Sequence, residues 1–143
     1  MAKLCLFSQI RQERKEGFRG QIPLGVGEVV MRRNFQETKV GTFFHTFNGL
    51  LADEIEKGIR VKTLVVGTVQ LRHLDFEPGT LIPDHHHPEE VLTMILEGTM
   101  EMRVGDETRA VRAGDVFRVP PKTSHSGRVF SERVVAVSWS PIQ

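Results

Sequence analysis

The chain has 143 residues, of which 39% are hydrophobic and 26% are charged, and its formal net charge is +1. These values are ordinary for a single globular domain with a sizeable core. A nearly neutral net charge argues against nucleic acid or a membrane surface as the main partner. The longest apolar run, VLTMIL, is far too short to span a bilayer.

The single cysteine, Cys5, excludes an internal disulfide and fits a reducing compartment. The amino-terminal stretch MAKLCLFSQI has no small-residue cleavage site and is followed at once by charged residues, which is not typical of a signal peptide. We therefore expect a cytoplasmic protein.

The first part of the chain, residues 1–40, is expected to be an N-terminal extension. A short helix is predicted after Ser8, ending near Gly17, and the following QIPLGVGEVV is broken by proline and glycines. From about residue 41 the sequence changes to short β-rich runs separated by turns, at the spacing typical of a sandwich or barrel. The predicted organisation is an extension over 1–40 and an all-β domain over 41–143.

Ten β-strands are predicted in this second part. One helical turn is expected among them, at DEIEKG (53–58), and the VGDE stretch predicts a tight hairpin in which Gly105 supplies a positive φ. The predicted strands cover residues 41–48, 60–67, 68–76, 80–86, 90–98, 99–105, 107–113, 115–120, 125–130 and 133–140.

Two of the predicted strands differ in their pattern. MEMRV alternates, which places Met100 and Met102 on one face and polar side chains on the other. VLTMIL (91–96) does not alternate, so both of its faces should be covered. In a barrel one face lines the lumen, and the other must meet the N-terminal extension or a second copy. We therefore expect a homodimer.

Three consecutive histidines precede the VLTMIL run. Side chains alternate along a strand, so His85 and His87 share a face and His86 points away. Two imidazoles at i and i+2 on an inward face form half of a metal site. Taken by itself, HHH fits a solvent-exposed polar turn equally well. A second stretch, GDVFRVPPKTSH, provides a turn, a strand, a proline and then His125.

Together the two stretches resemble the cupin superfamily, over roughly residues 60–141. The resemblance implies an antiparallel β-barrel, or jelly roll, that binds a divalent metal. It also implies that His85, His87 and His125 are the metal ligands. The residues that match the two cupin motifs are Gly79, His85, His87 and Gly98 for the first, and Gly114, Pro120 and His125 for the second.

The chain departs from these motifs at three places. Val91 stands where the first motif has its glutamate ligand, Lys122 replaces the inner glycine of the second motif, and Val129 replaces its asparagine. HHHPEEV also resembles the H-x-H-P-x-E-Q pattern of a subgroup of small cupins. If Val91 faces the lumen, Glu90 faces away and makes a loop hydrogen bond or an ion pair. The alternative is that Glu90, or else Glu89, bends inward as a fourth ligand.

The remaining inward positions are expected to form an apolar lumen. Trp139 is predicted to be one of its walls. Thr93 and Glu90 are the candidates for a general base, apart from water on the metal. Such a pocket suits a small substrate.

The first functional hypothesis is a metal-dependent enzyme that acts on a small molecule. Three neutral ligands leave the full charge on a divalent transition metal (Fe, Zn, Ni, Mn or Cu), which favours an anionic or chelating oxygen ligand. Some cupins bind iron through three histidines and cleave small substrates with dioxygen, so the resemblance implies that this chemistry is open to the chain. Lyase or hydrolase chemistry fits the same ligands. The alternative is a non-enzymatic protein that binds a small ligand or senses a metal.

Overall fold

The computed structural model describes residues 43–142, and all structural statements concern that part of the chain. The helix predicted after Ser8 and the extension over residues 1–40 lie outside the described residues. These expectations, and the domain boundary near residue 41, therefore stay predictions. No helix long and apolar enough to cross a membrane is found within residues 43–142.

The described part of the chain consists of β-strands joined by turns and loops, without a helix. Nine of the ten predicted strands are confirmed to within a few residues. The strands are β1 (Asp53–Glu56), β2 (Ile59–Val66), β3 (Val69–Phe76), β4 (Leu81–His85), β5 (Val91–Glu97), β6 (Thr99–Val104), β7 (Glu107–Arg112), β8 (Val116–Val119), β9 (His125–Val129) and β10 (Val134–Pro141).

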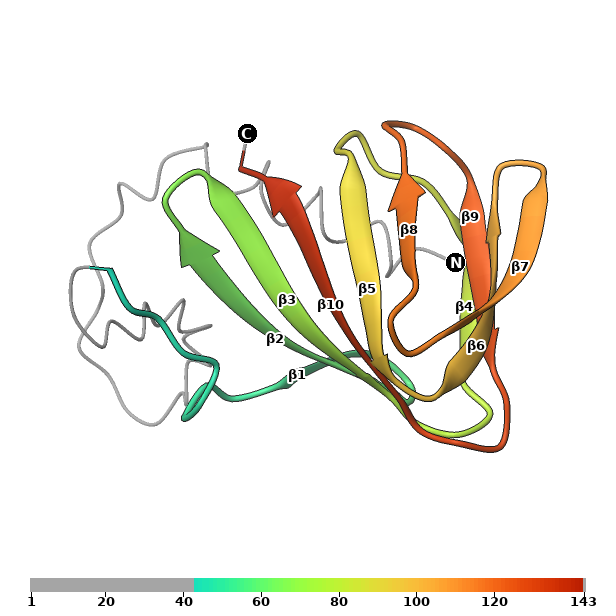
Figure 1. Ribbon diagram of the computed structural model, residues 1–143, viewed down its shortest axis with the longest axis horizontal. Coiled ribbons are helices and arrows are strands. Elements are labelled where there is room, and N and C mark those ends of the chain that lie inside the picture. Colours follow the sequence, from blue (N-terminus) through green and yellow to red (C-terminus); the bar gives the residue numbers. More distant parts are fainter. Residues whose placement is uncertain (1–42, 143) are drawn as a thin grey trace, which may run out of the picture.

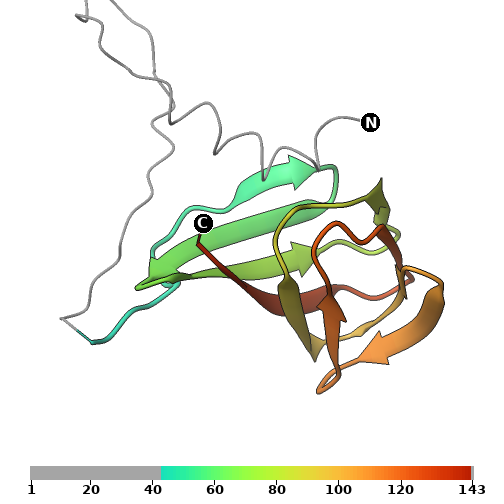
Figure 2. The same cartoon turned by 90° about the horizontal axis from the view of Figure 1, so that it is seen from above.

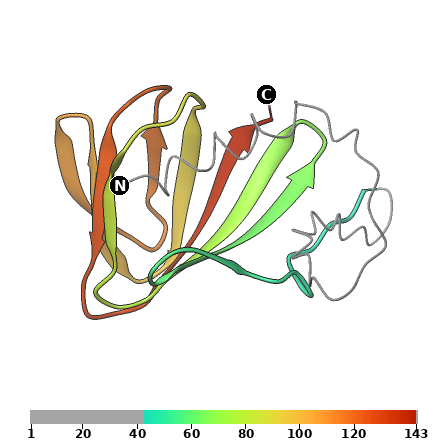
Figure 3. The ribbon, with the colours of Figure 1, turned by 180° about the vertical axis from the view of Figure 1, so that it is seen from behind.

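The strands form two antiparallel sheets that face each other (Figure 1). The larger sheet has six strands in the order β1-β2-β3-β10-β5-β8, and the smaller sheet has four in the order β4-β9-β6-β7. Figures 2 and 3 show the sheets from above and from behind, curved toward each other around a shared interior. The predicted all-β antiparallel barrel is confirmed.

Strand alternation determines which side chains fill this interior. Met100 and Met102 on β6 are 1% and 5% exposed, as their alternation with polar neighbours predicts. Full burial of a side chain of this size contributes about 1.5–3 kcal/mol. The buried core comprises Ile59, Val61, Phe76, Ile82, Ile95, Met100, Met102, Val111, Val129, Val134 and Ala136.

The position of β5 in the sheet explains why the run VLTMIL does not alternate between apolar and polar residues. β5 lies between β10 and β8. Val91, Thr93 and Ile95 point into the interior, whereas Leu92 and Met94 point to the outer face of the six-stranded sheet. Both faces of this strand are thus apolar, because one lines the interior and the other belongs to an apolar outer surface.

Two local predictions are wrong. Residues 53–58 form strand β1 and a turn instead of a helical turn, because pairing of Asp53 with Val61 and of Glu56 with Ile59 provides backbone hydrogen bonds along the edge of the sheet. A single helical turn satisfies too few backbone groups to compete. The strand predicted over 41–48 is reduced, in its described part, to a bridge at His45 followed by a turn.

Turn geometry explains two other positions. Gly105 has a φ of 57° at the β6–β7 turn, so the predicted hairpin is confirmed. Lys122 has a φ of 58° and is the one non-glycine residue with positive φ among residues 43–142. It stands where the second cupin motif has a glycine, which adopts this conformation without a steric penalty. Its N–H donates a 2.7 Å hydrogen bond to the carbonyl of His87.

Replacing Lys122 with glycine should therefore stabilise the fold. Relief of the left-handed strain outweighs the extra entropy of glycine in the unfolded chain, for a net gain of about 0.5–1 kcal/mol. Urea denaturation measures this difference. Lys57→Gly is the matched control, because Lys57 has no positive φ, and it should be destabilising. A Lys122→Gly variant that is less stable than the wild type would show that the lysine side chain outweighs the strain.

Candidate metal centre

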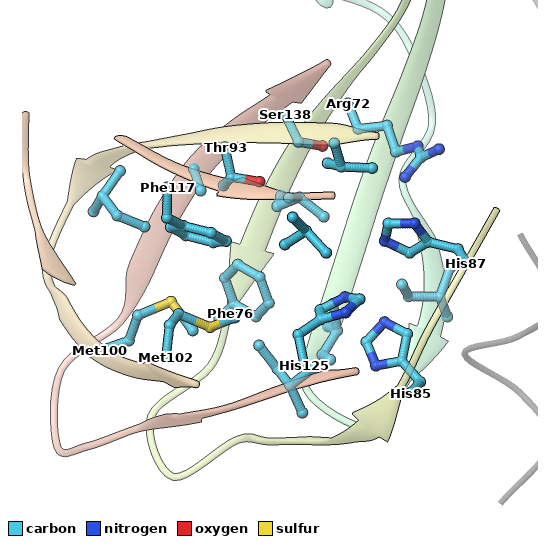
Figure 4. Close-up of a pocket in the computed structure, with 18 of the residues that line it drawn as sticks. Arg72, Phe76, His85, His87, Thr93, Met100, Met102, Phe117, His125 and Ser138 are labelled. Carbon is cyan, nitrogen blue, oxygen red and sulfur yellow. The ribbon is translucent and has the colours of Figure 1, made fainter. Parts of the chain in front are cut away.

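Three histidines from two strands and a loop converge at one end of the interior (Figure 4). His85 ends β4 and His125 begins β9, and the two are direct partners in the antiparallel register. Residues opposite each other in such a pair project to the same side, and their ring centroids are 4.0 Å apart. His87 follows in the loop after β4, with its ring centroid 4.8 Å from that of His125.

Each of the three rings is oriented by a backbone carbonyl two residues away. Nδ1 of His85 lies 2.8 Å from the Pro83 oxygen, and Nδ1 of His125 lies 2.9 Å from the Thr123 oxygen. Nδ1 of His87 lies 2.8 Å from the backbone oxygen of Glu89. A carbonyl only accepts, so each Nδ1 carries the proton and donates it. The lone pair on each ring is thereby assigned to Nε2, which is the arrangement that ligating histidines use.

The three rings could hold a metal ion. One ring nitrogen from each histidine lies within 4.8 Å of the others. Nitrogens bound to one zinc ion at about 2.1 Å in tetrahedral coordination lie about 3.4 Å apart. Ring movements of a fraction of an ångström therefore suffice to bring all three onto one ion.

Burial keeps two of these imidazoles, His87 and His125, uncharged. It lowers the pKa of His125 to about 4, and the neighbouring His85 and His87 rings add to this effect. Burial also lowers the pKa of His87. Neutral imidazole is the form that binds a metal. At neutral pH these two rings need not release a proton before they bind an ion.

A polar network supports the two strands that carry His85 and His125. Asp84, next to His85, accepts a 2.5 Å hydrogen bond from Nη2 of Arg103 and a 2.7 Å bond from the hydroxyl of Ser124. Ser124 is the neighbour of His125 in sequence. The network therefore links β4, β6 and the start of β9 on the side of the wall away from the metal centre.

The neighbours of the histidines are placed largely as the alternation predicts. His86 is exposed and does not line the interior. Val91 lines the pocket and is 8% exposed. Glu90 faces away and makes an ion pair with Arg118, in agreement with its predicted outward role. Glu89 instead turns inward, is 9% exposed and has a carboxylate oxygen 3.8 Å from Nδ1 of His87.

The histidines form part of the wall of an open pocket between the two sheets (Figure 4). Most other lining side chains are apolar, including Phe76, Phe117 and Met102. Trp139 does not line this pocket, so its predicted role as a wall is wrong. Side chains alternate along β10, and Ser138 points inward. The next residue, Trp139, therefore projects from the outer face of the sheet.

Two polar pocket residues, Arg72 on β3 and Ser138 on β10, were missed by sequence reasoning. Arg72 lies on the same face of β3 as the apolar residues Leu74 and Phe76, because the three are spaced two residues apart. This pattern could have indicated that Arg72 faces inward. Burial lowers the pKa of Arg72, an effect that the Glu89 carboxylate opposes. The guanidinium nevertheless keeps its charge at neutral pH.

Metal content should distinguish the three facing histidines from their neighbours. Alanine in place of His85, His87 or His125 should weaken metal affinity by more than the roughly 10–100-fold that loss of an outer partner costs. His86→Ala and Glu90→Ala are the matched controls and should retain near-stoichiometric metal. Elemental analysis of protein purified without a tag measures this. Metal loss in the Glu90→Ala variant would contradict the outward role of Glu90.

Comparison with known proteins agrees with this architecture. A family model described as the cupin domain matches residues 72–139. KdgF from Halomonas sp. aligns with a TM-score of 0.61 at 23% identity, over 72% of this chain and 96% of that one. An RmlC-like cupin from Shewanella frigidimarina aligns with a TM-score of 0.63 at 20% identity, over 72% of this chain and 94% of that one.

A cupin-like protein from Thermotoga maritima is 28% identical, with a TM-score of 0.53, over 58% of this chain and 68% of that one. The segment matched by the family model runs from β3 into β10 and carries all three facing histidines. The sequence match and the shared fold together show that this chain contains a cupin domain, which the family model places at residues 72–139.

Proposed function

We propose that this cupin domain is a metal-dependent enzyme that acts on a small anionic or chelating molecule. The observation that supports the proposal is the convergence of three carbonyl-oriented imidazoles on one side of a mainly apolar pocket. The ligand type suits Fe, Zn, Ni, Mn or Cu, and affinity by itself does not select among them. Dioxygenase, lyase and hydrolase reactions are the classes that such a centre serves.

The histidine side chains determine the charge at this centre. They contribute no negative charge, so a bound divalent ion would keep its full charge and would serve as a Lewis acid toward substrate oxygen atoms. An ion held by three protein ligands would also keep coordination positions open for water or a substrate. An anionic or chelating substrate is favoured because it offers oxygen atoms to those positions.

The rest of the pocket would bind the substrate and exclude water. Phe76, Phe117 and Met102 present apolar surface to the part of the substrate away from the histidines. Glu89 is the one carboxylate among the described residues that line the pocket. It is therefore a better candidate to accept a proton from the substrate than Glu90, which lies outside.

Oxygen uptake by iron-loaded protein tests the enzyme proposal. Protein reconstituted with Fe(II) should consume oxygen in the presence of at least one compound from a panel of catechol, 2-hydroxy acids and 2-oxo acids. His125→Ala should lose this activity, and His86→Ala should retain it. The same panel with zinc-loaded protein, followed by NMR, detects hydrolase or lyase products. Stable metal binding without turnover of any compound would favour the alternative of a ligand-binding or metal-sensing protein.

We also propose that two copies pack through the outer face of the six-stranded sheet. Leu92 and Met94 on β5, and Trp139 on β10, project from this face, and Val116 on β8 is 54% exposed. The proposed partners are thus a small molecule and a second copy of the chain.

We propose a cytoplasmic location as well, because the single cysteine, Cys5, fits a reducing compartment.

The mass of the chain in solution tests the homodimer. Wild-type protein should have the mass of two chains by light scattering, and Val116→Glu should shift it toward one chain, because a carboxylate would be buried at the interface. Leu81→Glu is the matched control, because Leu81 is 65% exposed on the other sheet. A wild-type mass of one chain would refute the dimer.

A further inference from the structure

A row of side chains crosses the inner face of the six-stranded sheet from β3 to β8. In the antiparallel register Arg72 pairs with Ser138, Ser138 pairs with Thr93, and Thr93 pairs with Phe117. Direct partners in antiparallel strands project to the same face, and all four residues line the pocket. Figure 4 shows this row along one wall, with Arg72 at the end nearest His87.

The two hydroxyls in the row are buried and have no partner within residues 43–142. Ser138 is 2% exposed and Thr93 is 7% exposed. Neither side chain makes a hydrogen bond to another residue in the described part of the chain. Buried polar groups without a protein partner are usually paired with water or a ligand, since leaving them unpaired is costly. These hydroxyls are therefore available to bind a polar group of a molecule in the pocket.

The charges in the pocket favour an anion. Apart from the histidines, Arg72 and Glu89 are the only residues with an ionisable side chain among the described residues that line the pocket. Arg72 interacts electrostatically with both Glu89 and His87. The two charges offset each other, so an ion held by the histidines would make the pocket positive overall. A guanidinium also matches a carboxylate in shape, because its N–H groups can bind both oxygen atoms.

We propose that Arg72, Ser138 and Thr93 form the substrate-recognition row of this pocket, and that its substrate is a small carboxylic acid with a further oxygen substituent. Arg72 binds the carboxylate beside the metal centre. The hydroxyls of Ser138 and Thr93 donate hydrogen bonds to the second oxygen. The apolar part of the molecule contacts Phe117 and Met102 at the floor. This assignment names the substrate class of the proposed enzyme and depends on that proposal for its chemistry.

Binding of three matched probes tests the row without any need for turnover. The probes are 2-oxopentanoate, its uncharged methyl ester and pentanoate, which lacks the oxo group, each titrated into zinc-loaded protein and followed by NMR. Wild-type protein should bind 2-oxopentanoate at least roughly tenfold more tightly than either of the others, since the ester lacks the negative charge that pairs with Arg72 and pentanoate lacks the oxo acceptor.

Variants then assign each group to its residue. Arg72→Gln should weaken binding of 2-oxopentanoate roughly tenfold or more, because a charge-assisted pair is lost. Ser138→Ala and Thr93→Val should instead remove the preference for 2-oxopentanoate over pentanoate. Arg60→Gln is the matched control, since Arg60 lies on the adjacent strand β2, pairs with Glu77 and is exposed. Arg72→Lys keeps the charge and replaces the Gln variant if that variant fails to fold.

The same samples separate this inference from the proposed enzyme. Unchanged binding of 2-oxopentanoate by a folded Arg72→Gln variant that retains zinc would overturn the row, as would a wild type that binds none of the probes. If the wild type takes up no metal, the proposed enzyme fails. Binding of 2-oxopentanoate to that metal-free protein, with its loss in Arg72→Gln, would still support the row.

Discussion

The pairing of β4 with β9 is the constraint on which the candidate metal centre depends. It places His85 directly opposite His125, so two potential ligands face the same space without any loop having to hold them there. The third ring, His87, leaves the strand but is tied back through its carbonyl, which accepts a hydrogen bond from the Lys122 N–H. One backbone ladder and one loop contact thus bring together residues that are about forty positions apart in sequence.

Burial and hydrogen bonding act together on these histidines. Burial disfavours the charged imidazolium, and the backbone carbonyls assign the proton to Nδ1 and the lone pair to Nε2. A group of neutral rings within 4.8 Å of one another is tolerable, whereas three charged rings at that separation would repel strongly. The same surroundings that make protonation unfavourable therefore prepare the site for a cation, because an ion bonds to the lone pairs that a proton would otherwise occupy.

Charged side chains lie on both sides of the barrel wall, in ion pairs on the outside and in the pocket on the inside. Outside the wall, Asp84 pairs with Arg103 and Glu90 pairs with Arg118. Exposed pairs of this kind add little to stability, so their main effect is to orient the segments beside the histidines. Inside, apart from the histidines, only Arg72 and Glu89 have an ionisable side chain among the described lining residues. The pocket is otherwise apolar, so the few polar groups it contains carry the recognition of a ligand.

Much of the site was predictable from the sequence, because strand alternation and motif spacing are local properties. Alternation placed His85 and His87 on one face and His86 on the other, and the resemblance to cupins added His125. Val91 inside with Glu90 outside was one of two alternatives that the sequence left open. Alternation defines two opposite faces but does not say which one is the interior, and so Trp139 was assigned to the wrong side. The row of Arg72, Ser138 and Thr93 depends on the register between strands far apart in the chain. Only the tertiary structure decides that register, because it is set by how the whole sheet packs its core.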